Sequence, residues 1–586
     1  MSRSRIAEVQ PLSGFDKSLY YKISQEIADQ LEVGSLVRIP LGTRSVLGLI
    51  FSLNPTAQLD GLKLKKIQSL VQKEPVISEE LIKLARWMSI YYSSSIETVL
   101  ETMIPAPIRN GMKASTQRFI QLEKKISETH ILTKLKRSPK QKILYDYLKS
   151  NDGTPVKTRE VMRTLSINES VINGLTSKGI ARVVTEISER IAYLDEIDQE
   201  EKAEMVEHIL TKEQSESITS ISMDLSLQKF TCRLLEGVTG SGKTEVYIQA
   251  MKIALSQDRG VIFLVPEVAL APQTVSRLRN AFQGNEDVVV WHSHLSAGER
   301  LDSWRKLSQG RARIVVGARS AVFAPVQQLG LVVVDEEHEP AFKQEDNPRY
   351  HARDIAVYRA KINNAICLLG SATPSMESLR NVQTGKYSLS KLTKRIDGRE
   401  LPLIHLVDMR RESIDKKTPT TLSFQLIEAL RQRFRNGEQS ILFLNRRGFN
   451  TSVFCPDCGE YEQCKDCSVG LTYHRSDDYL KCHLCGYRKR TPIVCPKCKS
   501  INLRKQGYGT QRIEDIVSKL MPKNATVVRV DGDTLGKKNL LRYILRDFRI
   551  GKIDVLIGTQ MIAKGLDFPN VTLVGVVDAD LPLRME

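Results

Sequence analysis

Hydrophobic residues follow several different periods along this chain of 586 residues, and the changes of period divide it into parts. Residues 34–54, GSLVRIPLGTRSVLGLIFSLN, alternate like the strands of a small barrel, and residues 79–105 then have apolar positions at helical spacing. In that helix we expect Trp87, Tyr91 and Tyr92 to be core residues. Residues 138–184 predict three short helices and a strand, as in a winged helix. Such modules often bind duplex DNA, but a protein-docking or spacer role fits this sequence nearly as well.

Two later regions alternate strands and helices, which is typical of parallel α/β lobes. The run LGLVVV at 329–334 is continuously apolar, which predicts a parallel strand buried on both faces. After a linker near 385–418, a helical pattern at 421–437 ends in Gly437, a plausible helix cap, and strand-like runs resume at 440–449.

Charge and hydropathy limit the kinds of partner. The formal net charge of +18 favours a polyanion, most often a nucleic acid. No apolar run approaches the roughly 18 residues that a membrane span requires, and the N-terminus lacks the apolar stretch of a signal peptide. We therefore expect a soluble protein of the cytoplasm with no membrane partner.

Eight of the ten cysteines lie between residues 455 and 498, as four Cys-x-x-Cys pairs. Four pairs supply eight thiolates, enough for two closed tetrahedral zinc sites, whereas disulfides are disfavoured in a reducing compartment. A nested arrangement joins the outer pairs on one ion and the inner pairs on the other, and two sequential ribbons are the competing arrangement. Two Zn²⁺ ions with a structural role are expected. The paired residues are Cys455/Cys458, Cys464/Cys467, Cys482/Cys485 and Cys495/Cys498.

The sequence GVTGSGKT at 237–244 follows an apolar run and precedes a helix-compatible segment, the strand–loop–helix pattern of a phosphate-binding loop. Gly237, Gly240 and Gly242 let backbone N–H groups converge on phosphates. Lys243 would reach the β and γ oxygens, and Thr244 would ligate Mg²⁺. The segment predicts a site for a nucleoside triphosphate.

A second buried run ends in DEEH at 335–338, where a nucleotide's metal would sit in an open α/β sheet. Asp335 would hold Mg²⁺, usually through water, and Glu336 would polarise the attacking water. A third strand ends in Ser371-Ala372-Thr373, small hydroxyl residues suited to relaying the state of the γ-phosphate. Loops at 265–274 and 316–325 suit a grip on a phosphate backbone, so a translocating motor is predicted.

These motifs, with GTQMIAKGLDFPNV at 558–571 and the eight cysteines, resemble the PriA family of bacterial replication-restart helicases over essentially the whole chain. The resemblance implies an ATP-dependent 3′–5′ DNA helicase that recognises stalled or abandoned forks and starts primosome assembly. It implies ATP and Mg²⁺ as cofactors, and forked and single-stranded DNA, primosome proteins and single-stranded DNA-binding protein as partners of a monomer.

The implied architecture is α/β, with two RecA-like lobes, a double-zinc insertion, a small β-rich DNA-binding domain and a winged-helix domain. The second lobe is expected to be incomplete. The expected parts are a 3′-end DNA-binding domain at 1–110, a winged helix at 111–200, lobe 1 at 205–395 and lobe 2 at 396–586, with the zinc insertion at 453–500.

The resemblance also assigns individual residues. Gln214 would read adenine, and the nested cysteine grouping is the one that the family has. The segment AFKQEDNPRYHARD at 341–354, called here the aromatic loop, would couple DNA contact to ATP hydrolysis. Its stacking faces and phosphate donors would be Phe342, Lys343, Tyr350, His351 and Arg353. Lys564 and Asp567 would also serve DNA contact and coupling. A pocket for a nascent 3′ end would comprise Phe15, Asp16, Gly42 and Lys65, with Lys63 as the alternative to Lys65.

Two departures from the family pattern affect these expectations. Leu566 replaces the histidine of a KGHD motif, which should alter coupling or rate but not fold. The chain ends at DADLPLRME, before the family's arginine motif, so we expect this sequence to be truncated. Without those arginines turnover would fall by about 10³ to 10⁵. The competing hypothesis is a nucleic-acid-binding assembly platform with little or no ATPase activity. An RNA helicase would not predict the N-terminal domain or this zinc insertion.

Overall fold

The computed structural model forms two compact units, Met1–Arg399 and Glu400–Glu586. The structure describes residues 6–55, 63–72, 74–112, 116–123, 131, 134–136, 138–151, 154–187, 209–266, 272–282, 287–293, 295–396, 398, 402–409, 411–412, 422–444, 452–455, 457–467, 469–474, 478–482, 485–506, 510–530, 540–559 and 568–579.

The first unit begins with a five-stranded antiparallel sheet in the order β2-β1-β4-β3-β5. Its core comes from alternating apolar side chains such as Val9, Ile39 and Ile50, as the barrel-like pattern predicted. Three helices follow the sheet. The elements are β1 (Ile6–Pro11), β2 (Leu19–Lys22), α1 (Gln25–Ala28), β3 (Leu36–Leu41), β4 (Arg44–Leu53), β5 (Ser69–Leu70), α2 (Glu79–Tyr91), α3 (Ile96–Met103) and α4 (Ala106–Arg109).

The next segment is a winged helix with a core of its own, formed around Ile120, Leu144 and Leu175. Its sheet has the order β7-β6-β8, and both pairings are antiparallel. The elements are β6 (Thr116–Leu122), α6 (Pro139–Ser150), β7 (Val156–Lys157), α7 (Thr158–Thr164), α8 (Glu169–Ser177) and β8 (Ala181–Ile187).

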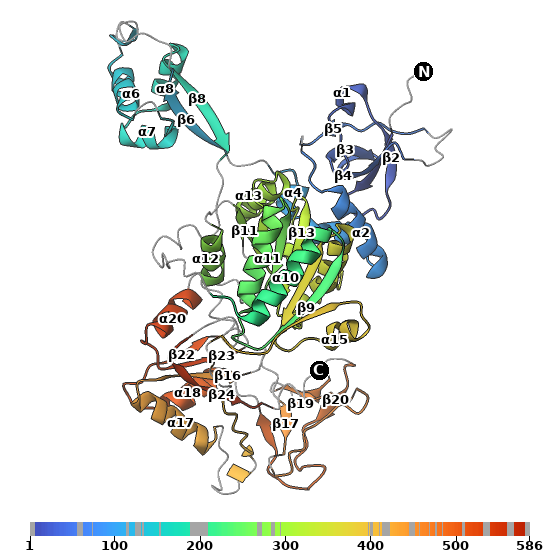
Figure 1. The fold of residues 1–586 in the computed structure, drawn as a ribbon, viewed down its shortest axis with the longest axis vertical. Helices are drawn as coiled ribbons and strands as arrows, with labels where there is room; N and C mark the ends of the chain where they lie inside the picture. The colour runs from blue at the N-terminus through green and yellow to red at the C-terminus, as the bar shows by residue number, and fades with distance from the viewer. Residues whose placement is uncertain are drawn as a thin grey trace. The chain divides into compact units, whose positions relative to one another are not determined.

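A seven-stranded parallel sheet in the order β11-β12-β10-β13-β14-β9-β15 forms the centre of the first lobe (Figure 1). Successive strand residues belong to different cores: Leu331 and Val333 pack with α10 and α11, and Val332 and Val334 pack with α13 and α14. The sheet is therefore buried on both faces, which explains its continuous apolar runs.

The elements of this lobe are α10 (Lys212–Leu227), β9 (Thr231–Gly237), α11 (Lys243–Ser256), β10 (Gly260–Leu264), α12 (Pro272–Ala281), β11 (Val288–Trp291), α13 (Ala297–Ser308), β12 (Ile314–Gly317), η2 (Arg319–Phe323), β13 (Leu329–Asp335), η3 (Pro340–Phe342), α14 (Ala352–Ile362), β14 (Ile366–Ser371), α15 (Met376–Gln383) and β15 (Ser388–Leu392).

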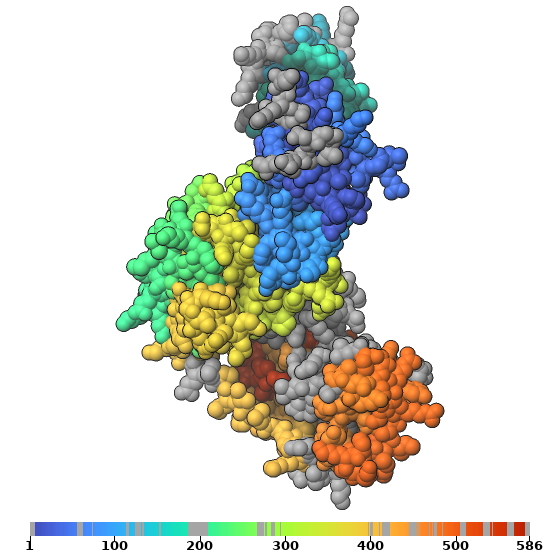
Figure 2. Space-filling view, turned by 90° about the vertical axis from the view of Figure 1, so that its right-hand side faces the viewer, coloured from blue at the N-terminus to red at the C-terminus, as the bar shows by residue number. Residues whose placement is uncertain are grey.

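Helices α2 to α4 pack directly on this lobe and share its hydrophobic core, as the contact between the light-blue and yellow-green surfaces in Figure 2 shows. Trp87 stacks on Tyr358 of α14 with ring centroids 3.8 Å apart. The Trp304 indole N–H donates to the Val76 carbonyl at 3.1 Å. The N-terminal helices and the first lobe therefore form one packed body.

The second unit has a four-stranded parallel sheet in the order β22-β23-β16-β24. The cysteine-rich insertion leaves after β16 and returns before α18, and the antiparallel β17–β21 pair joins its two ends. The elements are α17 (Phe424–Arg435), β16 (Gln439–Leu444), β17 (Ser452–Phe454), β18 (Thr472–His474), β19 (Tyr479–Lys481), β20 (Arg488–Arg490), β21 (Arg504–Gln506), α18 (Thr510–Leu520), β22 (Val527–Val530), α20 (Leu540–Arg549), β23 (Val555–Gly558) and β24 (Val571–Val577).

The fold class is therefore α/β with a parallel sheet in each unit, as predicted. Among the residues that the structure describes, no helix has the length and apolar character to cross a membrane.

A buried ion pair allows a test of the packing between α2 and the lobe. Arg359 is fully buried, and its Nε donates to Glu80 Oε1 at 2.7 Å. Because Glu80→Ala leaves that guanidinium without its carboxylate, we expect the free energy of unfolding to fall by about 3 kcal/mol. Thermal and urea unfolding of the whole chain measure this change.

The control is Glu79→Ala on the same helix, whose pair with Lys83 is 66% exposed on both sides and should cost less than about 1 kcal/mol. A double variant, Glu80→Ala/Arg359→Met, removes both charges and should recover part of the lost stability. Equal losses for Glu79→Ala and Glu80→Ala would contradict the assignment.

Candidate nucleotide site and cysteine clusters

Three neighbouring strands bring the predicted motor motifs to one edge of the first-lobe sheet. Strand β14 lies between β9 and β13, and all three run parallel, with Leu369 opposite both Leu234 and Val334. Since parallel strands end at the same edge, the phosphate loop after β9, DEEH after β13 and the GSAT segment after β14 emerge together.

The phosphate loop has the backbone geometry that its glycines permit. Gly240 and Gly242 have φ of +81° and +78°, values that residues with a Cβ rarely adopt. Lys243 begins α11, and its Nζ donates to the Gly237 carbonyl at 2.9 Å. The loop therefore presents a helix N-terminus and a lysine at the sheet edge, a combination that fits an anionic phosphate chain.

Gln214 lies against this loop and is only 2% exposed. Its side-chain N–H donates to the Ser241 carbonyl at 3.0 Å, and its carbonyl oxygen accepts from the Thr211 N–H at 2.8 Å. Both ends of the amide are thus used to hold the loop and cap α10. The predicted adenine contact stays a prediction.

Asp335 is bonded to the helix that follows the phosphate loop. The Tyr247 hydroxyl, one turn after Lys243 on α11, donates to Asp335 Oδ1 at 3.0 Å. Burial and the neighbouring Glu336 raise the pKa of Asp335 to about 6. Glu336 has a left-handed backbone with φ of +48°, a conformation that costs energy and often occurs at functional sites. The acidic pair therefore lies beside the phosphate loop.

His338 joins the acidic segment to the end of β14. Its Nδ1 lies 2.8 Å from Ser371 Oγ, and its Nε2 lies 3.4 Å from Thr373 Oγ1. The same ring lies 3.7 Å from a Glu336 carboxylate oxygen. The His338 ring thus connects the acidic segment to Ser371 and Thr373, the predicted relay residues.

Glu337 is fully buried and has four donors around it. The Ser375 N–H donates to Oε1 at 2.7 Å, and the Ser375 and Ser378 hydroxyls donate to Oε2 at 3.0 Å each. Arg353 Nη1 donates to Oε2 at 3.1 Å. Because a buried carboxylate needs such partners, Glu337 ties the acidic segment to α14 and α15.

The aromatic loop does not present its rings to solvent. Phe342 and Tyr350 are each 1% exposed, and Tyr350 meets Phe323 edge to face at 5.1 Å. The prediction that these two rings are stacking faces for DNA is therefore wrong for this structure, because the rings fill the core of the lobe. Arg353 is likewise engaged by Glu337 instead of being an open phosphate donor.

Two other residues of the aromatic loop contact the N-terminal helices. The His351 N–H donates to the Tyr92 hydroxyl at 3.3 Å, and the Lys343 ammonium lies 5.9 Å from the Tyr92 ring centroid. Burial and Arg353 lower the pKa of His351. Trp87 and Tyr92 pack against the core as predicted, whereas Tyr91 is 61% exposed, so its core prediction is wrong.

The residues of the predicted 3′-end pocket lie at one edge of the N-terminal sheet. The segment between β1 and β2 carries Phe15 and Asp16, and the β3–β4 turn carries Gly42; both connections lie at the same end of the paired β1 and β4. Lys65 Nζ donates to the Gly42 carbonyl at 3.0 Å, a contact that favours it over Lys63. Phe15 is 37% exposed, so its ring is open to a ligand.

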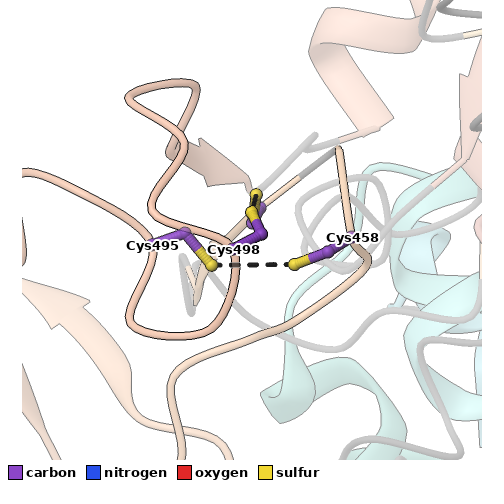
Figure 3. A group of neighbouring side chains, drawn as sticks. Cys458, Cys495 and Cys498 are labelled. Carbon is purple, nitrogen blue, oxygen red and sulfur yellow. Dashed lines mark hydrogen bonds between the residues drawn. The ribbon is translucent and has the colours of Figure 1, made fainter.

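The cysteines form two groups of four, in the nested arrangement. The outer pairs lie together, as do the inner pairs, and all donor atoms of a group are within 4.8 Å of one another. Figure 3 shows Cys458, Cys495 and Cys498 of the first group pointing toward a common centre. The groups are Cys455, Cys458, Cys495 and Cys498, and Cys464, Cys467, Cys482 and Cys485.

Sulfur separations fit a tetrahedral ion. They are 3.5 Å for Cys455–Cys498, 3.6 Å for Cys458–Cys495 and 3.5 Å for Cys464–Cys485. Two thiolates on a tetrahedral zinc, each 2.3 Å from the ion, lie about 3.8 Å apart. Four thiolates with no other ligand leave no open position, so these zinc-binding groups suit a structural role.

Sequence reasoning missed three residues of the nucleotide site: Tyr247, Glu337 and His338. Glu337 and His338 complete the DEEH segment, and their place directly after Asp335 and Glu336 was the signal that the sequence offered. Tyr247 lies one helical turn after Lys243, which places it on the same side of α11. The predicted coupling residues Lys564 and Asp567, and Leu566 between them, lie outside the described residues.

A phosphate loop, an acidic strand end and a hydroxyl-bearing strand at one edge of a parallel sheet define the motor lobe of a helicase. Family models agree: the DEAD/DEAH box helicase model matches residues 211–382, and the helicase conserved C-terminal domain matches 480–585. The 3′DNA-binding domain model matches residues 8–105, and the Cys-rich region of PriA DNA helicase matches 464–490.

Similar proteins make the assignment more specific. Replication restart protein PriA of Bacillus subtilis (strain 168) is 36% identical over 97% of this chain and 78% of its own length. The protein of the same name from Chlamydia muridarum is 37% identical over 98% of this chain and 76% of its own length. The chain belongs to the PriA family and is a DNA helicase of replication restart.

Zinc content tests the nested grouping. Whole chains should carry two zinc ions, measured by atomic emission after gel filtration. Cys455→Ala/Cys495→Ala removes two ligands from one group, so one ion should remain; Cys455→Ala/Cys464→Ala damages both groups, so both should be lost. The opposite result for the two variants would establish sequential ribbons instead.

The raised pKa of Asp335 gives a pH-dependent prediction. Above pH 6 the buried carboxylate is ionised in the folded chain at a cost on the order of 3 kcal/mol relative to the unfolded chain. Asp335→Asn removes this cost, so it should raise the melting temperature at pH 8 in EDTA without nucleotide. The gain should fall to roughly half by pH 5 and vanish below about pH 4.

The matched control is Asp346→Asn, which changes an exposed carboxylate of the aromatic loop and should leave the melting temperature unchanged at every pH. A gain for Asp335→Asn that does not depend on pH would show that the carboxylate is not held as described.

Proposed function

We propose that this DNA helicase is driven by ATP and moves 3′ to 5′, and that it recognises stalled or abandoned forks and starts primosome assembly. The observation that carries the proposal is the apposition of the phosphate loop to Asp335 through Tyr247, with Glu337 tying the acidic segment to the aromatic loop. That arrangement supports a motor in which nucleotide state and DNA contact are linked.

The residues fit an ATP–magnesium complex in the following way. The N–H groups of the phosphate loop and Lys243 would hold the phosphates, and Thr244 and Asp335 would hold Mg²⁺. Bound Mg²⁺ supplies charge neutralisation on the transferred phosphoryl group. Glu336 orients and polarises the attacking water, and the His338 ring lies 3.7 Å from that carboxylate and 2.8 Å from the Ser371 hydroxyl.

The remaining parts have assigned tasks in this proposal. Residues 1–110 hold the 3′ end of a nascent strand, 111–200 form the winged helix, 205–395 bind ATP and 396–586 form the second lobe with its insertion at 453–500. Lys564 and Asp567 serve coupling in the second lobe. Primosome proteins and single-stranded DNA-binding protein are the proposed partners, and two structural zinc ions shape the insertion.

Lys243→Ala tests the motor. The substitution removes the cation that meets the phosphates, so DNA-stimulated ATP hydrolysis should fall at least about a hundredfold. Binding of a labelled fork, followed by anisotropy, should stay within the error of the unsubstituted chain. Unwinding of partial duplexes with a 3′ or a 5′ single-stranded arm then gives the direction of movement.

The control is Lys252→Ala, an exposed lysine two turns further along α11, which should keep full activity. Fork binding without any DNA-stimulated hydrolysis in the unsubstituted chain would favour the assembly platform over the motor.

A further inference from the structure

The turn between α2 and α3, residues Tyr92–Ser95, lies between the 3′-end pocket and the aromatic loop. On the pocket side, the first turn of α3 is bonded to the segment between β1 and β2. The Ile96 N–H donates to Asp16 Oδ1 at 2.8 Å, and the Gly14 N–H donates to Glu97 Oε1 at 2.5 Å. Ser95 caps α3, and the carboxylate of a predicted pocket residue, Asp16, satisfies the first N–H of the same helix.

The other side of this α2–α3 turn holds the aromatic loop. The Ser94 hydroxyl, 6% exposed, donates to Asn347 Oδ1 at 2.5 Å. The Tyr92 hydroxyl accepts from the His351 N–H at 3.3 Å. Ser94 and Tyr92 lie two and four residues before Ile96, which bonds Asp16. A shift of Ile96 therefore shifts the two residues that hold the aromatic loop.

From His351 the contacts continue to the acidic segment of the nucleotide site. The Arg353 N–H donates to His351 Nδ1 at 3.3 Å, and the Arg353 guanidinium is paired with buried Glu337. Glu337 follows Glu336 directly in the chain. Hydrogen bonds of 2.5 to 3.3 Å, linked by short stretches of backbone, thus connect Asp16 to Glu337, the neighbour of the proposed catalytic base Glu336.

The packing around this path is rigid. Trp87 stacks on Tyr358, and Glu80 pairs with Arg359, so α2 cannot slide on the lobe without breaking a buried ion pair. A ligand that competes for Asp16 Oδ1 would weaken its bond to the Ile96 N–H, and the partly buried contacts of Ser94 and Tyr92 would pass that change to the aromatic loop. An interface that only held the N-terminal region on the lobe would not need Asp16, a predicted pocket residue, to bond the first N–H of α3.

We propose that the α2–α3 turn transmits occupancy of the 3′-end pocket to the motor, with Tyr92 and Ser94 as positioning residues of the aromatic loop. This inference rests on the proposed function, because a 3′-terminal nucleotide must occupy the pocket. The 3′-hydroxyl, a hydrogen-bond donor, is the group that would compete for Asp16.

Two forks test the relay, identical except that the nascent strand at the junction ends in a 3′-hydroxyl or a 3′-phosphate. Anisotropy gives the affinity for each fork, and ATP hydrolysis at saturating fork gives kcat. In the unsubstituted chain the two kcat values should differ about fivefold. In Tyr92→Phe/Ser94→Ala they should become equal, while the affinity difference and kcat on single-stranded DNA stay unchanged.

Hydrogen exchange provides a readout that does not depend on turnover. Adding the 3′-hydroxyl fork should change the protection of amides in residues 343–351 of the unsubstituted chain, and this change should be absent in the double variant. Tyr91→Phe, at the exposed neighbouring ring, is the matched control and should behave as the unsubstituted chain in every assay.

The outcomes separate the relay from the pocket. Tighter binding of the 3′-hydroxyl fork with equal kcat values and no exchange change would overturn the relay and leave the pocket standing. No preference in binding would overturn the pocket and the relay with it. A double variant that keeps the fivefold difference, or loses kcat equally on every DNA, would make the turn a structural contact only.

Discussion

Parallel pairing of β9, β14 and β13 is the constraint on which the motor site depends. Each strand buries alternating side chains in two different cores, so a slip of one residue would exchange the two sets and is strongly disfavoured. Fixed register brings the three strand ends level at one sheet edge. The site residues need no close sequence spacing, because the sheet supplies their proximity.

Glu337 extends this order from the sheet into the loops beside it. A fully buried carboxylate is tolerated only with its hydrogen bonds made, and its four donors come from α14, from Ser375 that caps α15 and from Ser378 on α15. Loops are usually the most mobile parts of a domain, yet here the acidic segment, the aromatic loop and the start of α15 share one charge. If one of these three segments moves, either the other two move with it or the Glu337 carboxylate loses some of its hydrogen bonds.

The sequence predicted the features that local chemistry determines. The phosphate loop, the buried strands and the cysteine pairs each follow from spacing or periodicity, and the residues of them that the structure describes lie where those patterns indicated. The aromatic loop shows the limit. Charged residues around Phe342 and Tyr350 are typical of a solvated loop, but both rings are buried in the core of the lobe, where Tyr350 meets Phe323 edge to face. The nested cysteine grouping similarly depends on closure of the insertion by β17 and β21.

Two parts of the N-terminal region differ in how their cores relate to the first lobe: one has a separate core and the other shares the core of the lobe. The winged helix has a hydrophobic core of its own, which shares no residue with the core of the lobe. Helices α2 to α4 instead complete the core of the first lobe, with Trp87 stacked on Tyr358 and with Val76, just before α2, accepting from Trp304. The sheet that bears the predicted 3′-end pocket is therefore attached to the lobe through a packed interior and through Asp16, which accepts from the Ile96 N–H. In the proposed relay, a ligand on this sheet strains the motor, because the described helices α2 to α4 that connect the two are packed into the core of the lobe.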